Sequence, residues 1–158
     1  MARPTPEQLE FRYDQWEPVL ERMAELARAG QGWLNLYPET VEDTEEEDEG
    51  SSVMGGLFGR RGPAVPMGTW VVATQRAPAS VGISHGVREK VVPRLREAGV
   101  HARDGWQLVQ DNPRRGLVAR LPADATPDEI LAWLMSAIDE LCPVALTGNW
   151  LAEIHPQS

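Results

Sequence analysis

Apolar and polar residues alternate on both sides of a short turn-forming stretch past the middle of the chain. Residues 105–110 and 116–121 flank the sequence Asp-Asn-Pro-Arg-Arg-Gly at 111–116, which combines turn formers with two adjacent cations. Alternation with a period of two on either side of such residues is typical of a β-hairpin. We therefore predict two antiparallel strands joined by a loop at 111–116.

Three further stretches have the pattern of strands. Residues 33–37 form a short apolar run, and residues 67–75 are rich in β-branched side chains. Near the end of the chain, at 144–154, Trp150, Ala152 and Ile154 alternate with Leu151 and Glu153. Short runs of this composition and period predict strands.

The N-terminal stretch has helical spacing. Thr5, Pro6 and Gln8 resemble a capping box, and apolar residues then recur at alternate steps of four and three: Leu9, Tyr13, Trp16, Leu20, Met23 and Ala27. Pro18 interrupts this stripe, so we expect a kink or two short helices meeting near Glu17. Gly30 and Gly32 end the segment.

Two more helices are predicted further along. Residues 87–98 have an apolar face, although Pro93 implies that regular helix begins only near Val92. Thr126, Pro127 and Glu129 form a stronger capping signature ahead of an apolar stripe that ends before Pro143. The second helix therefore spans about 126–141.

From residue 67 onward the predicted order is β-α-β-β-α-β. This is the ferredoxin-like pattern, an α+β fold in which two helices cover one face of an antiparallel sheet. We predict such a core at about 67–155, with its first and third strands central and the hairpin joining a central strand to an edge strand. The N-terminal helix and short strand would be additions. A three-layer α/β fold is the alternative.

Length and charge add one feature to this picture. The 158 residues fit a single domain, 1–158. Eight acids and no base lie between Glu39 and Glu49, so the rest of the chain carries −1 of the total charge of −9. With the glycines that follow, this composition predicts a mobile surface loop at 38–66, inserted before the core.

Composition also bears on partners and location. Because the chain has no strongly basic surface, we expect neither nucleic acid nor an anionic membrane as a partner. Cys142 is the only cysteine, and the first residues lack the apolar core of a signal peptide. A cytoplasmic protein is the expectation. Lys90 is the only lysine, and this usage is typical of a high-GC bacterium.

The sequence Gly-Ile-Ser-His-Gly at 82–86 matches the pattern G-x-S-x-G. In serine hydrolases this turn presents a nucleophilic serine, and an acid and a histidine follow later in the chain. Ser84 would be the nucleophile, His155 the base, and Glu153 or Asp139 the acid. The alternative is that Ser84 caps the helix that follows it.

The hairpin loop offers a second candidate site. Two guanidinium groups at Arg114 and Arg115 present paired donors for a phosphate or a carboxylate. Together with Ser84 and His85 they are the candidate ligand-binding residues. The alternative is that Arg114 and Arg115, like Arg60 and Arg61, are solvated or contact the acidic stretch.

No cofactor or metal is expected. The three histidines are scattered, and none has the short spacing of metal ligands: His85, His101 and His155. The glycines at 55–62 lack the Gly-Lys-Ser/Thr ending of a phosphate-binding loop, and the contiguous acids do not alternate as in a calcium loop.

Two functions are compatible with these observations. The first is a non-catalytic module that binds a small molecule or a protein, with an anionic group as one feature it would recognise. The alternative is a small serine hydrolase using Ser84. A homodimer is also a candidate state, because sheet edges of such domains readily pair.

Overall fold

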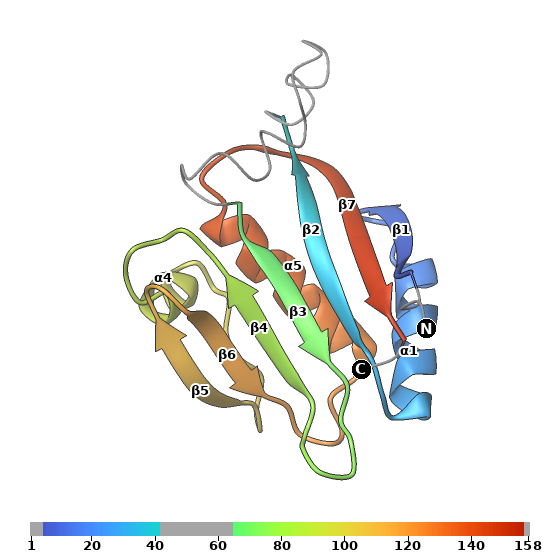
Figure 1. Cartoon of the computed structure of the whole chain (residues 1–158). Coiled ribbons are helices and arrows are strands. Elements are labelled where there is room, and N and C mark those ends of the chain that lie inside the picture. Colours follow the sequence, from blue (N-terminus) through green and yellow to red (C-terminus); the bar gives the residue numbers. More distant parts are fainter. Residues whose placement is uncertain (1–4, 42–64, 157–158) are drawn as a thin grey trace.

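A computed structural model describes residues 5–41 and 65–156 (Figure 1). Ten elements follow one another: β1 (Glu7–Arg12), α1 (Glu17–Ala29), β2 (Trp33–Thr40), β3 (Met67–Val71), β4 (Ser80–Ser84), α4 (Val92–Glu97), β5 (Gln107–Asn112), β6 (Gly116–Arg120), α5 (Pro127–Leu141) and β7 (Leu146–His155). The fold is mixed α+β.

All seven strands join one antiparallel sheet with the order β1-β7-β2-β3-β4-β6-β5. The C-terminal strand β7 thus lies between β1 and β2, the first two strands of the chain. At the other side of the sheet β5 is an edge strand with β6 as its neighbour.

The helices cover one face of this sheet, and α5 lies behind β3 and β2 in the view of Figure 1. Alternate strand residues point to that face and are buried, among them Leu34 and Leu36 of β2 and Ala152 and Ile154 of β7. They form one core with α1 and α5, in which Met23 and Leu134 are fully buried. The opposite face of the sheet has no helix over it among the described residues.

The ferredoxin-like core is not confirmed, because the sheet is larger and its order differs. Residues 76–86 lie between the strand predicted at 67–75 and the helix predicted at 87–98, yet they contain β4, and β4 pairs with β3 and β6. The first core strand, β3, therefore has β2 and β4 as neighbours instead of the strands that follow α4. The hairpin itself is confirmed as β5 and β6, although Asp111 and Asn112 belong to β5 and not to the loop.

The prediction of a helix beginning after Thr5 was wrong. Residues 7–12 are the strand β1, in which Leu9 and Phe11 alternate with polar residues and face Ala152 and Trp150 of β7. The helix α1 begins only at Glu17, with Pro18 in its first turn, where a missing N–H costs nothing. It ends at Ala29 and is followed by Gly30, which adopts a left-handed conformation (φ 69°).

The other helix predictions agree with the structure in part. Regular helix in α4 does begin at Val92, as Pro93 implied. The N-cap of α5 is formed by Thr126: its hydroxyl accepts from the Glu129 N–H at 3.3 Å and donates to the Glu129 carboxylate at 3.1 Å. Residues 38–40 of the predicted mobile loop belong to β2, whereas residues 42–64 lie outside the described part of the chain.

Candidate functional site

The structure does not bring Ser84 and His155 together. Ser84 is the last residue of β4, and His155 is the last residue of β7, with β2 and β3 between the two strands. Three strand spacings correspond to about 14 Å across the sheet. The register adds a further offset, because His155 is aligned through Trp33 and Val71 with Ser80, at the other end of β4.

Ser84 does not cap the following helix either. The turn of a nucleophile elbow is absent, since seven residues separate Ser84 from Val92, the first residue of α4. The backbone N–H groups of Val91 and Val92 instead donate to the Asp111 carboxylate at 2.9 and 3.1 Å. Asp111 of β5 therefore caps α4, and the sequence motif has no catalytic counterpart among the described residues.

Glu153 and His155, by contrast, are in contact on the uncovered face of the sheet. The Glu153 carboxylate lies 2.7 Å from His155 Nε2 and accepts from the Asn35 amide at 3.0 Å. Thr69 in turn donates to the Asn35 carbonyl at 2.8 Å, and Trp33 stacks on the His155 ring at 4.4 Å. This hydrogen-bonded ladder crosses three strands. The His155 contact lowers the pKa of Glu153, against the opposing effect of burial.

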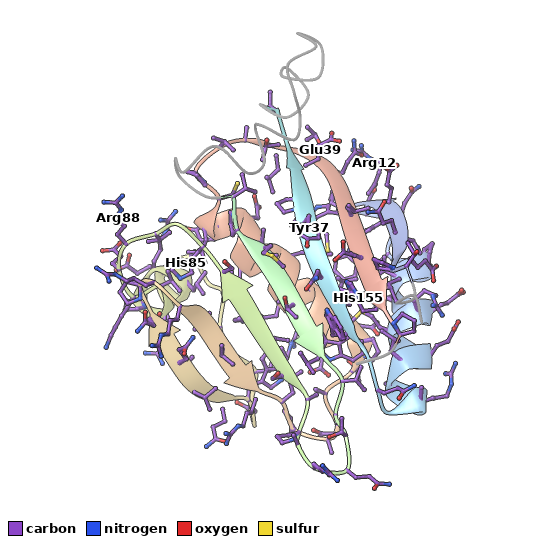
Figure 2. The ribbon with its side chains drawn as sticks, in the orientation of Figure 1. Arg12, Tyr37, Glu39, His85, Arg88 and His155 are labelled. Atoms are coloured by element: carbon purple, nitrogen blue, oxygen red, sulfur yellow. The ribbon has the colours of Figure 1, made fainter. Side chains whose placement is uncertain are left out.

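A second polar group lies further along the same face (Figure 2). The Glu39 carboxylate accepts from Thr147 at 2.9 Å and from Asn149 at 3.2 Å, and Arg12 donates to Asn149 at 2.8 Å. Tyr37 lies between the two groups on β2, and burial together with the Glu153 charge raises the pKa of its hydroxyl. Most polar side chains of this face therefore have partners within the protein.

His85, the histidine of the Gly-Ile-Ser-His-Gly sequence at 82–86, is buried. It is 8% exposed, and neither ring nitrogen has a hydrogen-bond partner among the described residues. Burial lowers the pKa of His85, although the nearby Asp111 carboxylate opposes that shift. His85 is therefore a largely buried imidazole near Asp111, the residue that caps α4.

Arg114 and Arg115 lie at the tip of the β5–β6 hairpin, as predicted, and both are exposed. Their backbone N–H groups donate to the Asn112 side chain at 2.8 and 2.9 Å, which fixes the turn. Within residues 5–41 and 65–156 their guanidinium groups form no ion pair. The hairpin approaches the end of β4, since Gly116 lies against the backbone of Ile83 and Ser84.

A cavity of about 260 Å³ lies on the helix side of the hairpin. Its walls come from α4, the loop after α4, β5, β6 and α5, and its lining is mostly apolar: Val92, Leu95, Arg96, Val100, His101, Ala102, Leu108, Leu117, Ala119 and Trp133. Trp106 packs edge-on against Trp133, with ring centroids 5.5 Å apart, and supports the cavity wall.

The cavity borders the edge strand β5, whose outer side is paired with no described strand. Leu108 and Val109 in this strand are 48% and 43% exposed. The opposite edge, β1, is different: it carries three charged residues, and Glu7 forms an ion pair with Arg22 of α1 at 2.7 Å. Charged edges resist pairing with other chains, whereas an apolar edge invites it.

The cavity was not predicted from the sequence, whereas the first strand of the hairpin was predicted to be an edge strand, and β5 does lie at an edge. The one local signal was the pair Leu108-Val109, two adjacent apolar residues that lie where the pairing of β5 with β6 shifts register. Arg96 and His101, which line the cavity, gave no signal of their own.

In the described parts of the chain, no three of the residues His, Cys, Asp and Glu come together as a metal site, and no helix is long and apolar enough to cross a bilayer. No protein-family model matches the sequence, and neither the curated proteins nor the solved structures contain a match.

Proposed function

We propose that this protein is a non-catalytic interaction module that binds an extended segment of a partner protein along the β5 edge. One observation carries the proposal: an apolar cavity adjoins an unpaired edge strand with exposed Leu108 and Val109. In this mode of recognition the peptide backbone pairs with the edge strand, and a side chain of the peptide enters a neighbouring pocket.

The size of the cavity favours a side chain over a small molecule as its occupant. Pockets for drug-sized ligands range from about 300 to 1,000 Å³, whereas this cavity measures about 260 Å³. It accepts one or two apolar side chains. The polar lining is limited to Arg96 and His101, so few groups are available to orient a polar small molecule.

The arrangement of titratable groups supports binding over catalysis. Ser84 lies on a different strand from the Glu153–His155 pair, and that pair is occupied by contacts with Asn35 and Trp33. A nucleophile needs a base within hydrogen-bond reach. The geometry of the described residues therefore gives no support to the serine hydrolase.

An unbiased peptide library tests the proposal. Random ten-residue peptides displayed on phage are selected on the protein and then on an Ala102→Trp variant, in which the new indole fills the cavity mouth. Ala102 lines the cavity and is exposed, so the substitution leaves the core intact. The matched control is Ala98→Trp, at an exposed position that does not line the cavity.

We expect a family of peptides with one conserved apolar residue that bind the protein and the Ala98→Trp control alike but lose at least tenfold in affinity for Ala102→Trp. Burial of one such side chain contributes about 1.5–3 kcal/mol, which corresponds to this loss or more. Selected peptides should also shift the indole N–H signals of Trp106 and Trp133 in NMR spectra. Enrichment of no peptide, or equal binding to both tryptophan variants, refutes the proposal.

A further inference from the structure

Positive charge is concentrated in the part of the chain that surrounds β5. Residues 88–116 contain seven of the fifteen basic residues and four acids, a net charge of +3, although the whole chain carries −9. One of the four acids, Asp111, is engaged by the backbone N–H groups at the start of α4. This stretch of the chain is therefore basic in an otherwise acidic protein, although Arg94 and Arg103 form ion pairs with Glu140 and Glu129 of α5.

These cations lie at both ends of β5. Arg96 lines the cavity, and Arg103, which precedes the strand, lies 3.8 Å from the Glu129 carboxylate. Arg114 and Arg115 follow directly after it, at the hairpin tip. A peptide of six to eight residues paired with β5 spans roughly 20–27 Å and passes both groups.

We propose that the segment bound at the β5 edge is acidic, with carboxylates on both sides of an apolar anchor residue. This inference rests on the proposed function and names the chemistry of its partner. Guanidinium groups pair with carboxylates through two parallel hydrogen bonds. The ends of the segment would meet Arg96 and Arg103 on one side of the anchor and Arg114 and Arg115 on the other.

The same charges disfavour a second copy of this strand as the occupant. Two antiparallel β5 strands would bring the Arg103 end of one copy beside the Arg114-Arg115 end of the other. Like charges opposed across an interface act against association. An acidic partner removes this repulsion, and its association would be steered by the field of the basic surface.

The composition of the selected peptides tests the inference separately from the function. Among peptides whose binding depends on the open cavity, we expect Asp and Glu to be enriched at least threefold over the unselected library at positions flanking the anchor. Cavity-dependent peptides with neutral or basic flanks would overturn the acidic partner and leave the proposed function standing. Loss of cavity dependence would overturn both.

Charge reversal provides the second measurement. An Arg114→Glu/Arg115→Glu variant should bind the best selected peptide about tenfold more weakly at 50 mM NaCl, and the difference should shrink at 500 mM NaCl. The control, Arg28→Glu/Arg76→Glu, makes the same change in net charge at exposed positions on α1 and the β3–β4 loop and should stay within twofold. An equal loss of peptide affinity in both variants would show that the effect comes from net charge, and it would overturn the proposed contact of the peptide with Arg114 and Arg115.

Sedimentation of the free protein completes the test. A monomer up to about 100 μM supports a foreign partner, because the like charges around β5 oppose pairing between copies. A dimer that is abolished by Ala102→Trp would instead place a second copy at this edge and overturn the proposal.

Discussion

Replacement of Asp111 by alanine should destabilise the protein through the loss of a cap that comes from another element. Both carboxylate oxygens of Asp111 are used, one for the N–H of Val91 at 2.9 Å and one for the N–H of Val92 at 3.1 Å. No side chain within α4 caps its start. The variant therefore leaves two partly buried donors without an acceptor.

The size of the effect follows from these two hydrogen bonds. Each unsatisfied donor costs about 1–3 kcal/mol when buried, and since both are only partly buried we expect roughly 2–4 kcal/mol in total. For a chain of this length that corresponds to a fall of about 5–15 °C in Tm. Asp111→Asn keeps one acceptor oxygen and should show about half the loss.

Urea denaturation and thermal melts followed by circular dichroism measure this loss. Asp104→Ala is the matched control, because it removes an equal charge from an exposed site in the same region. An Asp111→Ala variant within about 0.5 kcal/mol of the parent protein would refute the assigned cap. Since α4 also forms one wall of the cavity, the variant should weaken binding of the selected peptides at temperatures well below its Tm.

Three further predictions concern other positions. Gly116→Ala should lower the free energy of unfolding by at least about 3 kcal/mol, because Gly116 has φ +92° and a Cβ there would lie 2.3 Å from the Ile83 carbonyl oxygen. Gly99 also has a positive φ (+82°), but it is surrounded by open space. Gly99→Ala should therefore lower the free energy of unfolding by only about 1–2 kcal/mol, as measured by urea denaturation. Because burial lowers the pKa of His85 in the folded protein, the unfolded chain binds the proton at a higher pH than the folded protein does. The free energy of unfolding should therefore fall as the pH drops below about 6.5 and become constant below the lowered pKa. A His85→Leu variant should lack this part of the pH dependence of stability. Thr126→Ala should lower the free energy of unfolding by about 1 kcal/mol through the lost N-cap, and an unchanged value would contradict the role of this cap.

The elements that the sequence predicted correctly have local signals. In α5 the residues Thr126, Pro127 and Glu129 define the helix start, and they are adjacent in the chain. The β5–β6 hairpin is likewise defined by its own turn, in which Asn112 and Gly116 take the positions that a tight connection needs. Such elements can be predicted because their causes lie within a few residues.

The elements that the sequence missed depend on distant partners. Leu9 and Tyr13 fit a helical stripe, but Leu9 and Phe11 fit a strand equally well, and only the pairing with β7, about 140 residues later, decides between them. The strand β4 contains Gly82 and two serines and has little strand preference of its own. It is held as a strand because β3 and β6 pair with it on both sides.

The candidate site was accessible to sequence reasoning only in part. Arg114 and Arg115 at an exposed hairpin tip were predicted, since the turn itself placed them there. The cavity was not, because it is made by residues from α4, β6 and α5 that come together only in the folded chain. The edge position of β5 was predicted from the order of the elements, although the order of the other strands in the sheet differs from the predicted one.

The position of β7 between β1 and β2 has a consequence for the order of folding. Synthesis produces β1, α1 and β2 first, yet the gap between these two strands is filled by a segment that leaves the ribosome after every other described strand. Until then β1 has no partner in the sheet and one side of β2 is unpaired. Pairing over so long a separation is slow, and an unpaired strand side invites association with other chains. Nascent or truncated chains that lack β7 are therefore the forms of this protein most exposed to misassembly, and most in need of a chaperone.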